Sequence, residues 1–231
     1  MGFDLSLFES EPVLGIIRGV NEKSLKGVVE ASLAGGLRSL EITLNTPNPF
    51  HLIKSIQSKY RQIQIGAGTV LTVDEAKKAA ESGAQFIVAP NFEEEIAAFC
   101  VKNKIAYFPG ALTPTEIQKA WKSGATMVKV FPASQMGPDY FKTIKGPFND
   151  IKLMAVGGVN PANIKDYLGA GADAVALGGS IFSVQRMKNQ RFNEIQKDIE
   201  EFMFAVHRYY SKITKEDLTN RQLQVETKNE F

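Results

Sequence analysis

Short apolar runs alternate with helix-length amphipathic segments along most of the chain, and this alternation limits its possible folds more than any other feature. Most runs are nearly continuous, as is typical of parallel strands covered on both faces. The segments between them place apolar residues three and four positions apart and end in glycine, as amphipathic helices do. The eight expected strands are PVLGIIR (12–18), LRSLEITL (37–44), QIQIGAG (62–68), AQFIVAP (84–90), KIAYFPG (104–110), TMVKVFP (126–132), IKLMAVGG (151–158) and DAVALGG (173–179).

A recurring phrase supports this count of strands. Gly36, Gly83, Gly124 and Gly171 each join the end of an expected helix to the next strand, at steps of 47, 41 and 47 residues. Each step has room for two strand–helix units, although a glycine at a helix end also explains the phrase locally. Eight alternating units predict an α/β fold, a single-domain (β/α)8 TIM barrel. The alternative is an open doubly wound sheet, but the glycine-rich nucleotide-binding first turn of such sheets is missing.

Composition narrows the class of protein. The chain has 231 residues, of which 44% are hydrophobic, and this is enough for one substantial core. Its net charge is +2, and no basic stripe with interleaved aromatic residues suggests nucleic acid. No apolar run has the length of a membrane span, no export signal is visible at 1–12, and the single Cys100 allows no internal disulfide. We therefore expect a cytoplasmic protein with neither a nucleic-acid nor a membrane partner.

The expected domain covers residues 1–210 and consists of a barrel preceded by an N-terminal helix. A polar C-terminal extension follows at 211–231. The extension mixes charges of both signs. Three arrangements of it remain open: it can lengthen the last helix, pack on a neighbouring subunit, or lack order.

Two charged residues lie in the middle of expected strands rather than at their ends. Lys129 interrupts the apolar run TMVKVFP, and Glu41 lies between two apolar residues of LRSLEITL. Side chains alternate along a strand, so Val128 and Val130 are expected to face the helices while Lys129 enters the barrel. Active sites of such barrels lie at the carboxyl ends of the strands. Lys129 and Glu41 are therefore candidate site residues.

Two interpretations of this pair remain open. The first is a structural ion pair, with Arg18 as a third member. The second is an amine nucleophile served by a carboxyl group that moves protons. Apolar neighbours of Lys129 and the positive charge of Arg18 would lower the pKa of the amine and free its lone pair.

Glycine pairs end the last two strands, and they predict a phosphate site. Gly157 and Gly158 follow the seventh strand, and Gly178 and Gly179 precede Ser180 after the eighth. Backbone N–H groups can approach an anion closely at glycine, and we expect a short helix to begin near Ser180 and point its positive end at the anion. A metal site is not expected, since His51 and His207 are the only histidines and neither has a ligand-like spacing.

Eight stretches together resemble one known family, in the family's order, from about Pro12 to Ser183. They are LEITLNTPNPF, IGAGTV, AQFIVAPN, FPGALTPTE, MVKVFPAS, KGPF, AVGGVNPANI and ALGGS. The sequence resembles the class I aldolases that cleave 2-keto-3-deoxy-6-phosphogluconate (KDPG), a group also credited with 4-hydroxy-2-oxoglutarate (KHG) aldolase activity. The combination of stretches is highly specific.

The resemblance implies a (β/α)8 barrel that forms a homotrimer and uses neither a metal nor an organic cofactor. The partners it implies are a phosphorylated keto acid and pyruvate. Lys129 would form the Schiff base with the keto carbon, and Glu41 would move protons through a water. Thr69 would bind the pyruvyl carboxylate, Pro90 and Phe131 would shape the pocket, and Arg18 matches an arginine found in part of the family. The residues implied to hold the phosphate are Gly157, Gly158, Gly178, Gly179 and Ser180.

The sequence departs from the family pattern at two positions. Many members carry arginine where this chain has Asn45, so more of the anion binding must fall on Arg18. Members selective for the gluconate often carry threonine where this chain has Val156. LNTPNPF and AVGGV also resemble the branch that cleaves the C4 epimer, 2-keto-3-deoxy-6-phosphogalactonate (KDPGal), so either epimer remains open as the substrate. More remote alternatives are a phosphate-binding barrel isomerase or epimerase and a non-catalytic sugar-phosphate sensor.

Overall fold

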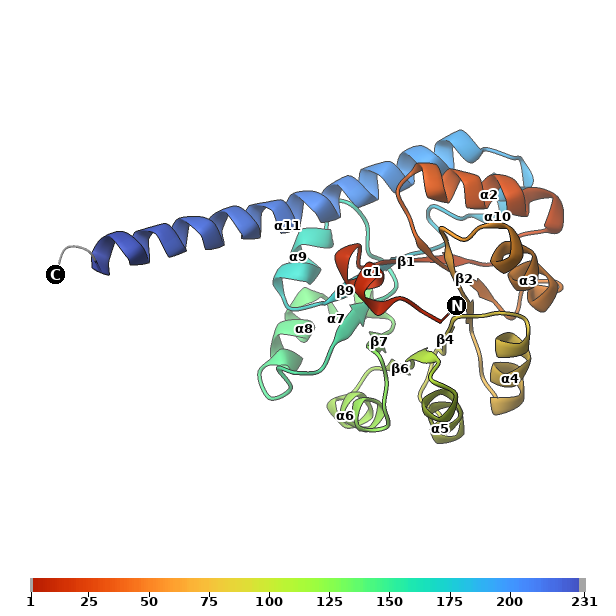
Figure 1. Cartoon of the computed structure of the whole chain (residues 1–231), viewed down its shortest axis with the longest axis horizontal. Coiled ribbons are helices and arrows are strands. Elements are labelled where there is room, and N and C mark those ends of the chain that lie inside the picture. Colours follow the sequence, from red (N-terminus) through yellow and green to blue (C-terminus); the bar gives the residue numbers. More distant parts are fainter. Residues whose placement is uncertain (1, 229–231) are drawn as a thin grey trace.

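The structure, a computed structural model, describes residues 2–228, with side chains described through Lys212. Its strands are all parallel to their neighbours and form one curved sheet surrounded by helices (Figure 1). The strands are β1 (Val13–Ile17), β2 (Ser39–Thr43), β3 (Gln64–Gly68), β4 (Phe86–Val88), β5 (Ala106–Phe108), β6 (Gly110–Ala111), β7 (Val128–Val130), β8 (Leu153–Ala155) and β9 (Ala174–Leu177). The predicted α/β barrel is thereby confirmed.

Helices follow the strands in the alternation expected from the sequence. They are α1 (Leu5–Ser10), α2 (Glu22–Ala34), α3 (Pro49–Lys59), α4 (Val73–Glu81), α5 (Glu94–Asn103), α6 (Pro114–Lys122), α7 (Ala133–Met136), α8 (Pro138–Lys145), α9 (Ile164–Gly169), α10 (Val184–Lys188) and α11 (Phe192–Lys228). Capping boxes begin α4 and α6, where Thr72 and Thr113 each exchange hydrogen bonds with the glutamate three residues on. The four glycines of the recurring phrase all have φ between +91° and +101°, as a glycine that ends a helix requires.

The count of eight strands needs one correction. The fifth expected run, 104–110, is divided at Pro109 into β5, which pairs with β4, and β6, which pairs with β7. Proline has no N–H to donate to a strand ladder. The carbonyl oxygen of Pro109 nevertheless accepts a hydrogen bond from the N–H of Lys129 at 2.8 Å, so the two ends of the nine-stranded sheet meet at Pro109.

The barrel encloses a small apolar core that is closed at one mouth by α1. Phe8 is 1% exposed, and its ring packs with that of Phe108 at 5.7 Å between centroids. The ring of Phe3 also contacts Phe108, at 5.6 Å. These residues close the mouth at the amino ends of the strands, where α1 lies in Figure 1. The opposite mouth remains available for a site.

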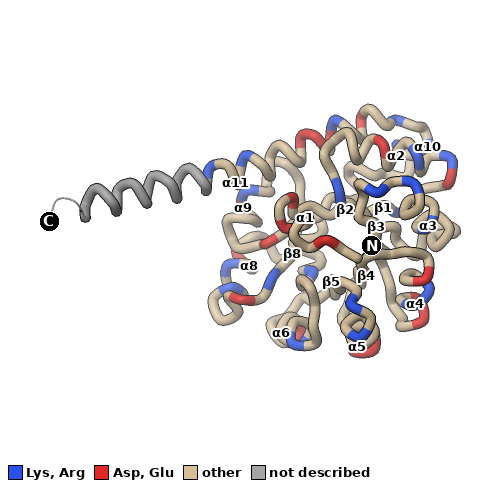
Figure 2. Tube along the Cα trace, in the orientation of Figure 1, with Lys and Arg blue, Asp and Glu red and all other residues tan. Residues whose placement is uncertain are grey.

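The last helix, α11, packs along α2 and α9 on the outside of the barrel (Figure 1). It crosses the expected domain boundary at residue 210 without a break and runs to Lys228. Where the domain ends stays a prediction, and the side chains beyond Lys212 lie outside the described residues. Lysine, arginine and acidic residues are interspersed along the described part of the chain (Figure 2). In this part of the chain, none of the helices combines the length and apolar character of a membrane span.

Candidate active site

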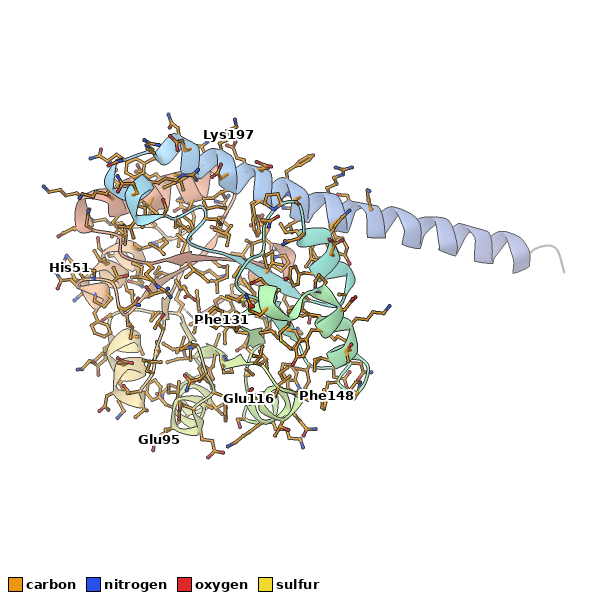
Figure 3. All side chains as sticks on the ribbon, turned by 180° about the vertical axis from the view of Figure 1, so that it is seen from behind. His51, Glu95, Glu116, Phe131, Phe148 and Lys197 are labelled. Atoms are coloured by element: carbon orange, nitrogen blue, oxygen red, sulfur yellow. The ribbon has the colours of Figure 1, made fainter. Side chains whose placement is uncertain are left out.

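A cavity of about 630 Å³ opens at the carboxyl ends of the strands. Every candidate site residue from the sequence lines it, and these residues come from seven of the strands or from the loops that follow them. They are Arg18, Glu41, Thr69, Pro90, Lys129, Phe131, Gly157, Gly158, Gly178, Gly179 and Ser180. Phe131 lies near the middle of the barrel in Figure 3, which views the molecule from the side opposite to Figure 1.

Lys129 is the central residue of β7 and points into the barrel as expected. Its neighbours Val128 and Val130 are fully buried in the core between strands and helices, while Lys129 itself is 7% exposed at the cavity. Its ammonium nitrogen lies 5.0 Å from the centroid of the Phe131 ring. Burial lowers the pKa of Lys129, Glu41 raises it, and Arg18 lowers it further. The net shift favours the neutral amine, which is the nucleophilic form.

Glu41 enters the same cavity from β2 and is 1% exposed. Burial raises its pKa from 4.5 to about 7, against the opposing charges of Lys129 and Arg18. Among the described residues, no donor hydrogen-bonds its buried Oε2 atom. A carboxyl group with a pKa near neutrality can both accept and return a proton at ordinary pH.

The structural ion pair that was one interpretation does not form. Among the side chains that the structure describes, no salt bridge joins Lys129 to Glu41 or to another carboxylate. The two groups affect each other's pKa through space, yet each faces the shared cavity separately. This arrangement suits two groups that act on one molecule between them.

Arg18 follows β1, and a hydroxyl network fixes the backbone beside it. The N–H of Gly19 donates to the Thr46 hydroxyl at 2.9 Å, and Thr46 Oγ1 lies 3.2 Å from that of Thr43. Both threonines are buried. Arg18 and Lys129 are the only cationic residues lining this cavity within the described chain, whereas Asn45 is exposed and lies outside the lining.

Thr69, directly after β3, has an unusual backbone conformation. Its φ is +58°, in the left-handed region that β-branched residues rarely adopt. Such strain is costly and concentrates at functional sites, where the surrounding structure holds it. The conformation brings Thr69 into the cavity lining at the turn into α4.

The glycine pairs leave backbone exposed at the cavity, and there is little room for a side chain at Gly158. Gly157 and Gly158 have φ of +97° and +82°, and a Cβ on Gly158 would lie 2.4 Å from that of Ser134. In the described structure, the N–H groups of Gly158, Gly179 and Ser180 donate to no protein acceptor. They can therefore donate to an anionic ligand.

The short helix that was expected near Ser180 begins slightly later in the chain. α10 begins at Val184, and Ser180 lies in the turn before it. The reason is local: Ser183 is the N-cap, and its hydroxyl accepts the N–H of Arg186 at 3.2 Å. The helix was expected to begin near Ser180, and in the structure Ser183 caps it.

Several cavity residues were not anticipated. Alternation along β1 and β9 could have found Ile16 and Ala176, but the geometry of loops brings in the others, which no local pattern marks. The additional lining residues are Ile16, Val159, Asn160, Ala176, Phe182, Ser183 and Val184. Val156, singled out as a departure from the family, also lines the cavity and is 3% exposed.

The histidines lie outside this cavity. His51 is 3.3 Å from Glu22 on the exposed side of α3, and His207 is exposed on α11. Over the part of the chain that the structure describes, no three or more His, Cys, Asp or Glu side chains gather in a way that could hold a metal ion.

Comparison with known proteins identifies the family. The family model described as "Aldolase: KDPG and KHG aldolase" matches residues 6–198, most of the chain. The chain belongs to this family. The 2-dehydro-3-deoxy-6-phosphogalactonate aldolase of Escherichia coli is 35% identical over 185 residues, or 78% of this chain and 90% of that protein. The 2-dehydro-3-deoxy-phosphogluconate aldolase of Pseudomonas aeruginosa is 34% identical over 169 residues, or 73% of this chain and 76% of that protein.

A solved structure of the KDPG/KHG aldolase family also shares the fold. The KDPG aldolase of Legionella pneumophila, with pyruvate captured as a covalent carbinolamine, superposes with a TM-score of 0.79 at 28% identity. The match covers 84% of this chain and 95% of that one. As a KDPG/KHG aldolase family member, the protein is a lyase; one of these relatives is named for the galactonate and the other for the gluconate.

Proposed function

We propose that this KDPG/KHG aldolase is a class I enzyme that cleaves 2-keto-3-deoxy-6-phosphogluconate to pyruvate and glyceraldehyde 3-phosphate through a Schiff base on Lys129. The observation that carries the proposal is a buried lysine of lowered pKa at a cavity shared with a carboxyl group of raised pKa. The carbinolamine in the Legionella relative is the intermediate that precedes a Schiff base.

In the proposed reaction the electron sink is the iminium ion formed on Lys129. Its neutral amine attacks the C2 carbonyl, and loss of water from the carbinolamine gives an iminium ion. Glu41 takes the C4 hydroxyl proton, directly or through a water, while the C3–C4 bond breaks and its electrons move to the iminium as an enamine. Glyceraldehyde 3-phosphate leaves, C3 of the enamine gains a proton, and water hydrolyses the iminium to release pyruvate and the free amine.

The remaining cavity residues bind the substrate. Thr69 holds the pyruvyl carboxylate, Pro90 and Phe131 enclose the carbon chain, and Arg18 supplies positive charge toward the anionic groups. The free N–H groups beside the two glycine pairs, together with the Ser180 hydroxyl, hold the phosphate. This assignment needs neither a metal nor an organic cofactor. The assembly proposed from the family resemblance is a homotrimer, which light scattering would test.

The C4 epimer KDPGal is the alternative substrate, and the unphosphorylated 4-hydroxy-2-oxoglutarate is a further one. Relatives named for the galactonate and for the gluconate are almost equally similar, at 35% and 34% identity. Val156 lines the cavity, where threonine would supply a hydroxyl group. We propose that this relaxes selectivity between the epimers, because a pocket discriminates strongly only where it hydrogen-bonds the distinguishing group. Val156→Thr should then change the ratio of kcat/KM for the two epimers; the same ratio in both proteins would count against the idea.

A coupled assay of pyruvate release tests the activity itself. Each epimer and 4-hydroxy-2-oxoglutarate are supplied separately with EDTA present, and pyruvate is measured with lactate dehydrogenase. Lys129→Ala should abolish turnover, and Glu41→Gln should slow it by about a hundredfold or more, as loss of a proton-transfer group does. Full metal-independent activity in Lys129→Ala would rule out the mechanism. Conversion of a substrate to its isomer without pyruvate would favour an isomerase, and binding without turnover would favour a sensor.

A further inference from the structure

Gly68, the last residue of β3, lies directly beside the Glu41 carboxyl group. A Cβ atom built on Gly68 would lie 2.1 Å from Glu41 Oε1, 2.5 Å from its Cδ and 3.1 Å from its Cγ. The first two distances are shorter than real Cβ contacts. All three nearest atoms belong to Glu41, so the space above Gly68 is occupied by this one side chain.

The backbone does not require glycine at this position. Gly68 is not among the residues with positive φ, and it lies in a regular strand whose register pairs it with Thr43 of β2. Glycine in a strand interior weakens the strand, because it has more backbone freedom to lose and no side chain to pack. The reason for glycine here must therefore come from the neighbour that its missing side chain accommodates.

Glu41 depends on such a neighbour because hydrogen bonds do not hold it. Within the described residues no donor reaches its buried Oε2, and no salt bridge joins it to Lys129. Its position is set by the atoms packed around it, in a side chain that is 1% exposed. The side chain borders the cavity, and the missing side chain of Gly68 leaves room for it on the β3 side.

We propose that Gly68 is a positioning residue, whose missing side chain sets where the Glu41 carboxyl group stands relative to Lys129. The proposal rests on the proposed function, in which Glu41 moves protons for a substrate bound to Lys129. A methyl group at position 68 displaces the carboxyl group into the cavity and leaves the charges of the site unchanged.

A double-mutant cycle tests this inference. Gly68→Ala adds the obstructing methyl group, and Glu41→Asp withdraws the carboxyl group by one methylene, about 1.5 Å. Gly68→Ala should still form the borohydride-trapped pyruvate adduct on Lys129 but lose tenfold or more in kcat and in deuterium exchange at the pyruvate methyl group. The double variant should be at least tenfold more active than the product of the two single losses, because the shorter side chain fits the narrower space.

Gly66→Ala is the matched control on the same strand. Gly66 also faces the barrel, but its added Cβ would meet the Phe86 ring at 2.3 Å rather than the carboxyl group of Glu41. Glu41→Asp should therefore fail to rescue Gly66→Ala. If Gly68→Ala does not fold, its combination with Glu41→Asp should restore the folded state by circular dichroism.

Three results would overturn the inference: wild-type kcat in Gly68→Ala, strictly multiplicative losses in the cycle, or a double variant that stays unfolded along with Gly68→Ala. Failure of the proposed function looks different, because the wild-type protein itself would then give no adduct on Lys129.

Discussion

Glu41→Gln should make the folded protein more stable at pH 8 while it removes most of the activity. The pKa of the Glu41 carboxyl group is raised from 4.5 to about 7 by burial. A carboxyl group with a raised pKa binds its proton more tightly in the folded protein, so folding is favoured at low pH. This contribution is fully present below pH 4.5 and is lost as pH rises to about 7.

The size of the effect on stability follows from the shift in the pKa of Glu41. Each pKa unit corresponds to about 1.4 kcal/mol, so ionised Glu41 lowers the free energy of unfolding by about 3 kcal/mol above pH 7. Glutamine has nearly the same shape and stays neutral, so it escapes this cost. Replacing Glu41 also removes the charge that raises the pKa of Lys129, which makes about 3 kcal/mol an upper limit for the gain.

Urea unfolding of both proteins at pH 4, 6 and 8, at one protein concentration, measures this effect. The difference in the free energy of unfolding between Glu41→Gln and wild type should grow from pH 4 to pH 8. Glu81→Gln, which removes an exposed carboxylate from the end of α4, is the matched control. A difference that stays constant between pH 4 and pH 8 would refute the reasoning that burial holds this carboxyl group near neutrality.

Three further predictions follow from the site and the barrel. The acid side of the kcat/KM profile should fall below about pH 7 as Glu41 is protonated, and Arg18→Met should move that limb to higher pH, since the arginine charge lowers the pKa of Glu41. Thr46→Val should cost about 1–3 kcal/mol in urea unfolding by leaving the N–H of Gly19 unpaired, with a raised KM, while Thr46→Ser restores both. Phe8→Ala should cost about 3–5 kcal/mol by opening a cavity in the closed mouth, with kcat preserved at temperatures where the protein stays folded.

Charge within apolar runs was a sufficient signal for two of the residues that line the cavity. Lys129 and Glu41 each lie between two apolar residues of a strand, and the period of two along a strand correctly directed Lys129 into the barrel. The glycine pairs were recognisable because two consecutive strands end in the same way. These signals are local, and each lies on a strand whose register the barrel fixes.

The features that sequence reasoning missed depend on distant contacts. The run 104–110 is divided at Pro109 because its first part pairs with β4 and its second part with β7. The apolar pattern of the run does not show which strands it pairs with. Val184 reaches the cavity because of the turn before α10, and Gly68 matters because a side chain from another strand fills the space beside it. Such relations appear only when the chain is folded.

Trapping with pyruvate and borohydride tests the central claim most directly. The protein is incubated with pyruvate in the presence of EDTA, reduced and digested, and the modified peptide is identified by mass spectrometry. A reduced adduct on Lys129, missing from Lys129→Ala, is the predicted result. A folded wild-type protein that gives no adduct, or one modified equally at other lysines, would contradict the assignment of Lys129 as the nucleophile.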